Sequence, residues 1–216
     1  MNKSEKEMNR MRDKVRKGYE EGRYAKEYRE GREIREFEKE LFEDLFEEIG
    51  EEGYILDLGC GIGIPFDRYF VDKGYEVTGV DFVENNVKRA KMNVSEAEFL
   101  NADFSKLSFP KESFDAIVSF YAIFHIPREE HLDLLEKMNR WLKESGVILI
   151  TMGTGDDERI ESEFVGSDVG SDMVWSSFSI QKNKELVRKA GFKILRSYEE
   201  TQEEHHLWIL AEKKDS

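Results

Sequence analysis

The chain has 216 residues, which is the length of one domain or of one domain with a helical extension. Hydrophobic residues make up 39% of it and aromatic residues 12%, which is enough for a buried core and excludes a disordered chain. Its 33 basic and 47 acidic residues give a net charge of −14, which argues against a nucleic-acid partner because phosphate groups are bound by clustered Lys and Arg.

A single cysteine, Cys60, excludes a disulfide framework and a multi-cysteine zinc site, and the sequence predicts no metal. No apolar run is long enough to span a membrane, and the first residues do not have the pattern of a signal peptide. We therefore expect a cytoplasmic protein without a membrane partner.

Residues 1–52 are densely charged and are expected to form an N-terminal helical cap. Apolar residues between 34 and 49 recur at helical spacing, so they predict a helix that packs on a domain spanning residues 53–216 and ends at Gly50. Tyr19, Tyr24 and Tyr28 precede this helix. They fit either amphipathic packing or a lid over a ligand, and Tyr28 is a candidate cofactor contact.

From residue 53 onward, short apolar runs alternate with helical stretches. Strands are predicted at 54–58, 76–80, 114–120 and 147–151, with a weaker one at 98–100, and helices at 65–73, 84–93 and 128–144. A further helix at 182–190 and strands at 192–197 and 206–212 follow, the last pair antiparallel. This order predicts an α/β fold with a Rossmann-like, doubly wound sheet that is mostly parallel and has an antiparallel last strand. Residues 153–177 are expected to form a long loop or insertion on the substrate side.

A glycine-rich turn follows the first of these strands. Gly59, Gly61 and Gly63 let the backbone turn sharply and let a ligand approach closely, and Pro65 suits the first position of a helix. Asp81, at the end of the second strand, is placed to accept hydrogen bonds from ribose hydroxyls. Asp57 is an acid in an apolar strand, so it either caps loop amides or also faces a cationic ligand.

These motifs resemble those of the class I S-adenosylmethionine-dependent methyltransferases. Residues 57–63 resemble the first motif of that family, residues 77–81 its ribose-binding strand, and residues 101–104 the strand end whose acid meets the adenine amino group. The resemblance continues through the fourth and fifth strands and covers roughly residues 54–152.

The resemblance implies S-adenosylmethionine as the cofactor. It places the three glycines of the turn against the cofactor, Asp81 on the ribose and Asp103 near the adenine. Phe82 and Phe104 either sandwich the purine or serve as core aromatics. Cys60 and Phe120 complete the predicted cofactor-binding set.

Candidate catalytic residues follow the fourth strand. His125 has a side chain suited to proton transfer, although it fits a packing or capping role equally well, and Tyr121 is placed to contact cofactor or substrate. Trp175, Phe178 and His206 are the predicted substrate contacts, and at most one of His205 and His206 is expected to face the site.

The acceptor is expected to be a small molecule. The motif of DNA amine methyltransferases is missing after the fourth strand, and seven acids face one arginine in residues 153–177. The chain is expected to be a monomer or homodimer. Two other functions stay open: a non-catalytic S-adenosylmethionine-binding regulator, and a nicotinamide-dependent oxidoreductase, which the glycine spacing disfavours.

Overall fold

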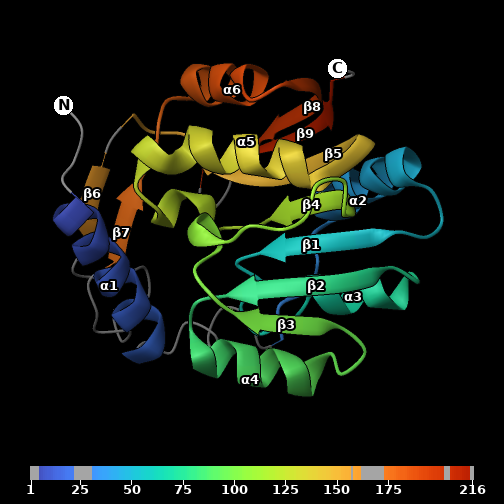
Figure 1. Ribbon diagram of the computed structural model, residues 1–216, viewed down its shortest axis with the longest axis horizontal. Coiled ribbons are helices and arrows are strands. Elements are labelled where there is room, and N and C mark those ends of the chain that lie inside the picture. Colours follow the sequence, from blue (N-terminus) through green and yellow to red (C-terminus); the bar gives the residue numbers. More distant parts are fainter. Residues whose placement is uncertain (1–4, 22–30, 157, 162–172, 202–204, 215–216) are drawn as a thin grey trace.

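The computed structural model describes residues 5–21, 31–156, 158–161, 173–201 and 205–214. A seven-stranded sheet with the order β3-β2-β1-β4-β5-β9-β8 forms its centre (Figure 1). All neighbouring strands are parallel except where β9 pairs with β5 and β8. The strands are β1 (Tyr54–Leu58), β2 (Glu76–Asp81), β3 (Glu98–Asn101), β4 (Phe114–Ser119), β5 (Leu142–Gly153), β8 (Phe192–Glu199) and β9 (His206–Lys213).

Apolar side chains on both faces of the central strands explain why helices cover both sides. Neighbouring residues of a strand point to opposite faces, and Ile55 and Leu56 of β1 accordingly belong to two different core clusters. One cluster includes α5 (His131–Trp141) and α6 (Ile180–Lys189), and the other includes α2 (Glu36–Ile49) and α3 (Phe66–Asp72). The helix α4 (Glu84–Asn93) packs on β2 and β3.

The carboxyl ends of the parallel strands lie beneath a second layer. In Figure 1 the arrowheads of β1 to β4 point toward α1 (Glu5–Glu21) and a small antiparallel sheet of β6 (Glu158–Glu161) and β7 (Met173–Ser176). Met11 and Val15 of α1 pack against Met173 and Val174 of β7. The carboxyl edge of the sheet, where open α/β folds bind ligands, is therefore covered by α1.

The predicted fold class is confirmed, with three local corrections. The helix predicted at 128–144 ends at Trp141, because β5 begins at Leu142, which pairs with Phe114. The start of this helix is buried although the surrounding sequence is charged: His131 is 1% exposed and packs edge-on against Phe178. Part of the loop predicted at 153–177 is the pair β6–β7. Among the described helices, none is long and apolar enough to cross a membrane.

Candidate active site

A pocket lies between α1 and the carboxyl ends of β1, β2, β3 and β4. The predicted site residues that line it are Asp57, Gly59, Cys60, Gly61, Asp81, Phe82, Asp103, Phe104, Phe120, Tyr121 and His125. The topology thus brings together residues from four strand ends that are up to 68 positions apart (125 − 57).

The turn after β1 needs glycine at two positions for different reasons. Gly59 has a φ of +90°, and a Cβ there would lie 2.3 Å from the Cβ of Ala122. Gly61 has a φ of +58°, and apart from its chain neighbours no described heavy atom lies within 4 Å of the position of a Cβ. Gly61 therefore exposes backbone to open space in the pocket, where a ligand can approach it.

Asp81 connects this turn to the end of β2. One carboxylate oxygen accepts from the Gly61 amide at 3.0 Å, and the other accepts from the Val83 amide at 2.8 Å and from Asn86 at 3.4 Å. Burial outweighs these hydrogen bonds and raises the pKa of Asp81 from 3.8 to about 6. The carboxylate is ionised at neutral pH and is available to further donors in the pocket.

Asp57 shares its face of the sheet with α3, which carries a second buried acid, Asp67. The two residues are 2% and 1% exposed. Burial raises the pKa of Asp67 well above its usual range, and the charge of the neighbouring Asp57 and a hydrogen bond with it raise it further. Asp67 therefore favours its neutral form, and Asp57 is the member of this pair that lines the pocket.

Asp103 lies at the end of β3 and contacts the covering helix. Its Oδ1 accepts from the amide and hydroxyl of Ser105, and its Oδ2 lies 3.1 Å from Nε of Arg12. Arg12 also contacts Glu130 at the start of α5. The Arg12 side chain of α1 therefore connects Asp103, the acid predicted to contact the adenine, to Glu130 at the start of α5.

His125 is hydrogen-bonded through both ring nitrogens. Nδ1 lies 2.9 Å from the carbonyl oxygen of Val174, which can only accept, so Nδ1 carries the proton. Nε2 is 2.9 Å from the Tyr19 hydroxyl of α1 and accepts from it. Burial lowers the pKa of His125 to about 4, so the ring is neutral at physiological pH and presents a lone pair on Nε2.

Tyr121 has a φ of +58° and places its hydroxyl beneath the segment before α2. That hydroxyl accepts from Nη2 of Arg35 at 2.9 Å and donates to Oε1 of Glu38 at 3.1 Å. Its position predicts a contact with a ligand through the ring, because the ring lines the pocket while the hydroxyl is bound on the other side.

The other predicted residues lie near the pocket or away from it. Trp175 packs against His125, which lines the pocket, and their ring centroids are 4.7 Å apart. His206 stacks on Phe124 at 4.8 Å, one layer behind Tyr121, whereas His205 is exposed. Phe178 lies under Arg128, 5.1 Å from its guanidinium, so its position does not favour the substrate role predicted for it.

Three other residues of the predicted cofactor-binding set differ in their surroundings. A Cβ on Gly63 would meet Val94 and Phe99 at 3.1 and 3.3 Å, so this glycine serves the packing of the turn against α4 and β3. Tyr28 lies outside the described residues. Cys60 lines the pocket, and burial raises the pKa of its thiol, which argues against a reactive thiolate there.

Reasoning from the sequence missed Arg12 and Asp67 and left Tyr19 undecided. Arg12 belongs to a run of alternating charges without a distinguishing pattern. The sequence did indicate Asp67. It lies in the first turn of the helix that follows the glycine turn, and that place is close to the end of β1, which carries Asp57.

Residues 56–150 match the family model described as a methyltransferase domain. The chain therefore contains a methyltransferase domain. The predicted resemblance to class I S-adenosylmethionine-dependent methyltransferases is confirmed, and the sheet order and the antiparallel β9 agree with it.

Individual relatives of this methyltransferase domain are more distant. The chain is 30% identical to a sterol 24-C-methyltransferase of Gibberella zeae over 152 residues, which are 65% of this chain and 40% of that protein. It is 34% identical to a phosphoethanolamine N-methyltransferase of Plasmodium falciparum over 117 residues, which are 52% of this chain and 43% of that protein. The chain thus spans less than half the length of these curated relatives.

Among solved structures, the chain resembles the 1,6-didemethyltoxoflavin-N1-methyltransferase of Burkholderia thailandensis, which was crystallised with 1,6-didemethyltoxoflavin and S-adenosylhomocysteine. The TM-score is 0.75 at 20% identity, and the match covers 100% of this chain and 92% of that chain. At this identity the likeness shows the fold alone.

Proposed function

We propose that the protein binds S-adenosylmethionine and transfers its methyl group to a small-molecule acceptor by in-line displacement. The observation that carries the proposal is one pocket that joins a glycine turn and two strand-end acids, Asp81 and Asp103, to a neutral histidine ring, His125. The glycine turn and the two acids suit a nucleoside, and the histidine suits an acceptor that must lose a proton.

The residues present fit this cofactor. The open space at Gly61 admits a ligand against the backbone, Asp81 suits the ribose hydroxyls, and Asp103 suits the adenine amino group. Asp57, a buried acid that lines the pocket, suits positive charge. When bound, the sulfonium supplies an activated methyl group, so the protein's contribution is to position the reactants and exclude water.

The pair of His125 and Tyr19 supports a role on the acceptor side. Because the carbonyl of Val174 fixes the proton on Nδ1, Nε2 is free to accept a proton or to orient a donor. In the described state the donor is the Tyr19 hydroxyl. An acceptor hydroxyl or amine would take the place of Tyr19 or extend the hydrogen bond through it.

A methylation screen tests the proposed function. Phosphoethanolamine, ethanolamine, a sterol and small phenols are suitable probe acceptors, with release of S-adenosylhomocysteine as the readout. We expect turnover with at least one small acceptor and none with DNA. Cofactor binding without turnover on any acceptor would favour the regulatory alternative. An effect of NAD without one of S-adenosylhomocysteine would favour the oxidoreductase.

We expect His125→Asn to lower kcat by roughly a hundredfold with the acceptor found, because the substituted amide keeps a donor for Val174 but loses Nε2. The Kd of S-adenosylhomocysteine should change by less than about twofold, and Tyr19→Phe should cause a smaller loss of kcat. Since the pKa of His125 is about 4, the kcat/KM of the wild type for the acceptor, measured at saturating cofactor, should not fall between about pH 8 and pH 6. An inflection near pH 6.5 that His125→Asn removes would contradict the assignment.

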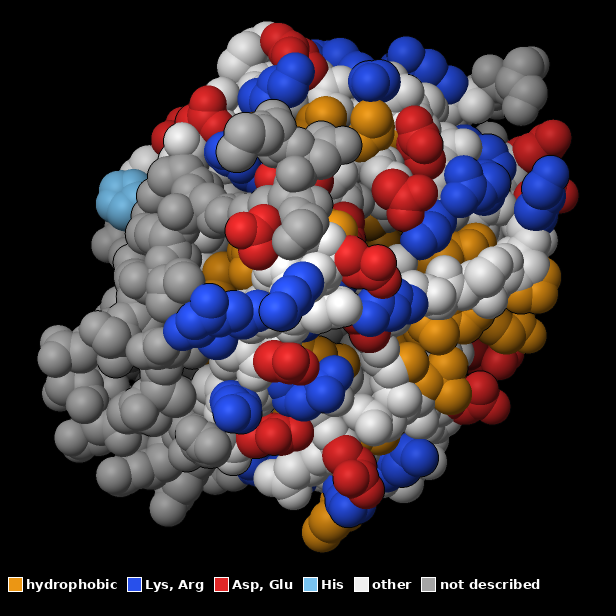
Figure 2. Space-filling view, turned by 60° about the vertical axis from the view of Figure 1, so that its left-hand side comes forward, with side chains coloured by type: hydrophobic (Ala, Val, Ile, Leu, Met, Phe, Trp, Pro, Cys, Tyr) orange, Lys and Arg blue, Asp and Glu red, His pale blue; other side chains and the backbone are white. Residues whose placement is uncertain are grey.

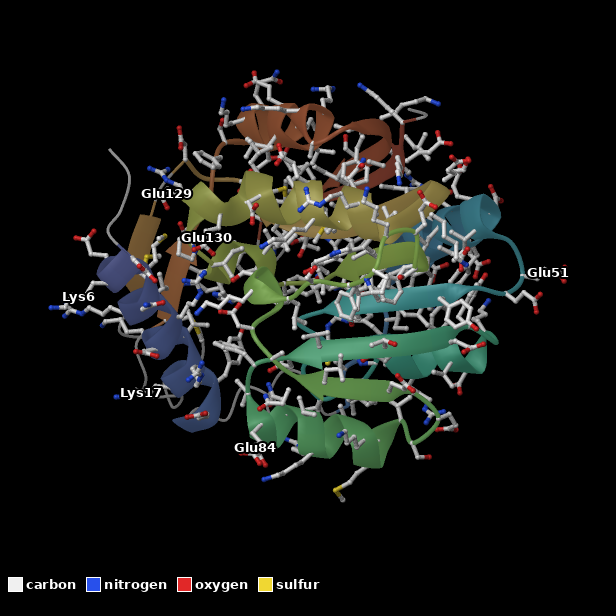
Figure 3. All side chains as sticks on the ribbon, in the orientation of Figure 1. Lys6, Lys17, Glu51, Glu84, Glu129 and Glu130 are labelled. Atoms are coloured by element: carbon white, nitrogen blue, oxygen red, sulfur yellow. The ribbon has the colours of Figure 1, made fainter. Side chains whose placement is uncertain are left out.

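We propose that α1 is a lid that closes over the cofactor. Arg12→Gln removes the cation that joins α1 to Asp103 and Glu130, so we expect the dissociation rate of S-adenosylhomocysteine to rise by roughly tenfold in stopped-flow measurements. Lys17→Gln is the matched control, because Lys17 lies on the same helix and points away from the sheet (Figure 3). Equal rates in the wild type and Arg12→Gln would show that α1 does not gate the pocket.

We also propose that the protein is cytoplasmic and has no nucleic-acid partner. Acidic and basic side chains are interspersed on the described part of the face that carries α1 (Figure 2), which supports the absence of a nucleic-acid partner. The free thiol of Cys60 supports a reducing, cytoplasmic setting. A monomer or homodimer remains the prediction for the assembly.

A further inference from the structure

The Tyr19 hydroxyl donates to the ring nitrogen that the proposed reaction would use as a base. Its oxygen lies 2.9 Å from Nε2 of His125, and the two rings meet edge-on with their centroids 5.5 Å apart. Both side chains line the pocket. A phenol of the protein's own α1 therefore lies on the lone pair of His125, so this part of the pocket accommodates an aromatic ring that carries an O–H donor.

The side chains around this contact are mainly apolar. Val15 of α1 and Ile126 line the pocket on either side of it. Trp175 packs on the His125 ring with a centroid distance of 4.7 Å. A molecule that replaces the phenol of Tyr19 would thus place its donor on Nε2 and an apolar body against these side chains.

The charged residues of the pocket do not suit an anionic acceptor. Among the described lining residues Arg12 is the one Arg or Lys, whereas Asp57, Asp81 and Asp103 are acids. Arg12 is already paired, because its Nε lies 3.1 Å from Asp103 and its Nη2 contacts Glu130. A phosphate or carboxylate group that entered this pocket would lose its water and meet mainly carboxylates, which is costly.

His125 also limits how weak an acid the acceptor can be. Burial lowers the pKa of its ring to about 4, so the ring is a weak base. Each unit by which the pKa of the acceptor exceeds that of the base makes the proton transfer tenfold less favourable. A phenol, with a pKa of about 10, is better matched than an aliphatic alcohol, whose acidity is close to that of water.

We propose that Tyr19 occupies the place of the acceptor's reacting group, and that the acceptor is an uncharged aromatic molecule whose O–H or ring N–H displaces Tyr19 from Nε2 of His125. The assignment rests on the proposed function and extends it to the class of substrate. The transfer balances: the acceptor's proton moves to Nε2, the acceptor atom bonds to the methyl carbon, and the electron pair of the broken carbon–sulfur bond stays on sulfur.

The test uses three probes of similar size that differ in one group on the ring. Phenol carries an uncharged donor, anisole has a methyl ether in its place, and benzoate carries an anion. Each is titrated at about pH 7.5 into the full chain saturated with S-adenosylhomocysteine, and the nitrogen chemical shift of Nε2 of His125 is followed by NMR. We expect phenol to bind about fivefold more tightly than anisole, and benzoate to bind more weakly than either.

Three variants test the place of the acceptor. Tyr19→Phe removes the internal hydroxyl that competes for Nε2, so phenol should bind it about three- to tenfold more tightly than it binds the wild type. Tyr69→Phe is the matched control and should leave the Kd unchanged, because the Tyr69 hydroxyl donates to Glu43 and the residue is not among the described ones that line the pocket. His125→Asn should reduce the preference for phenol over anisole, measured by calorimetry, to less than about twofold.

Three results would overturn the assignment while the proposed function stands. Equal affinity of the wild type and Tyr19→Phe for phenol would mean that Tyr19 does not occupy the acceptor's place. Binding of anisole or benzoate as tight as that of phenol would exclude an uncharged donor as the recognised group. Absence of phenol binding to a protein that binds S-adenosylhomocysteine would exclude the aromatic class. If S-adenosylhomocysteine itself did not bind the wild type, the proposed function would fail, and the assignment with it.

Discussion

Gly59→Ala is expected to lower the free energy of unfolding by about 3 kcal/mol or more. Two effects add at this position. An alanine at a φ of +90° is strained, and its Cβ would lie 2.3 Å from the Cβ of Ala122, where β4 gives way to the segment that carries His125. Urea denaturation followed by circular dichroism measures the loss.

Gly50→Ala is the matched control for this prediction. Gly50 has a φ of +83°, and apart from its chain neighbours no described heavy atom lies within 4 Å of the position of a Cβ. Gly50→Ala should lower the free energy of unfolding only through backbone strain, by about 1–2 kcal/mol. If the two variants unfolded at the same urea concentration, the close approach of the glycine turn to Ala122 would not exist in solution.

The affinity for S-adenosylhomocysteine should rise with pH through about 6, because ribose hydroxyls donate to the ionised form of Asp81. Its pKa is raised to about 6 by burial, so a proton must leave before the ligand binds at lower pH. At about pH 5 roughly a tenth of the carboxylate is ionised, so the Kd there should be about tenfold weaker than at pH 7.5.

The stability of the unliganded protein should change in the opposite direction. Between the ordinary carboxyl pKa of 3.8 and about 6, the folded state binds more protons at Asp81 than the unfolded state does. The contribution of Asp81 to the free energy of unfolding therefore falls as the pH rises through this window.

Asp81→Asn separates these effects. The variant should bind S-adenosylhomocysteine about 1–3 kcal/mol more weakly at pH 7.5, and its Kd should no longer vary around pH 6. Calorimetry of both proteins at several pH values provides the measurement. A wild-type Kd that stays constant from pH 5 to pH 7.5 would mean that the ribose does not contact Asp81.

The part of the site that could be predicted from the sequence is the part built by local rules. Residues that follow a strand end lie at one edge of a parallel sheet, so Asp57, Asp81 and Asp103 were expected to converge, and all three line the pocket. The glycine turn was predictable for the same reason, since a strand that turns sharply into a helix needs positive φ angles.

The remaining part depends on contacts between segments that are far apart in the chain. Arg12 reaches Asp103, and Tyr19 reaches His125, only because α1 packs on β7. No period or spacing within a highly charged segment distinguishes these residues from their solvated neighbours. The end of α5 at Trp141 was missed because pairing of Leu142 with β4 overrides the helical pattern.

Calorimetric titration of the wild-type protein with S-adenosylhomocysteine at about pH 7.5 tests the central claim most directly. The account predicts one binding site per chain with a Kd on the order of micromolar, and a large loss of affinity in Gly61→Ala, whose methyl group would enter the open space of the pocket. Absence of binding heat together with an unchanged melting temperature would contradict it.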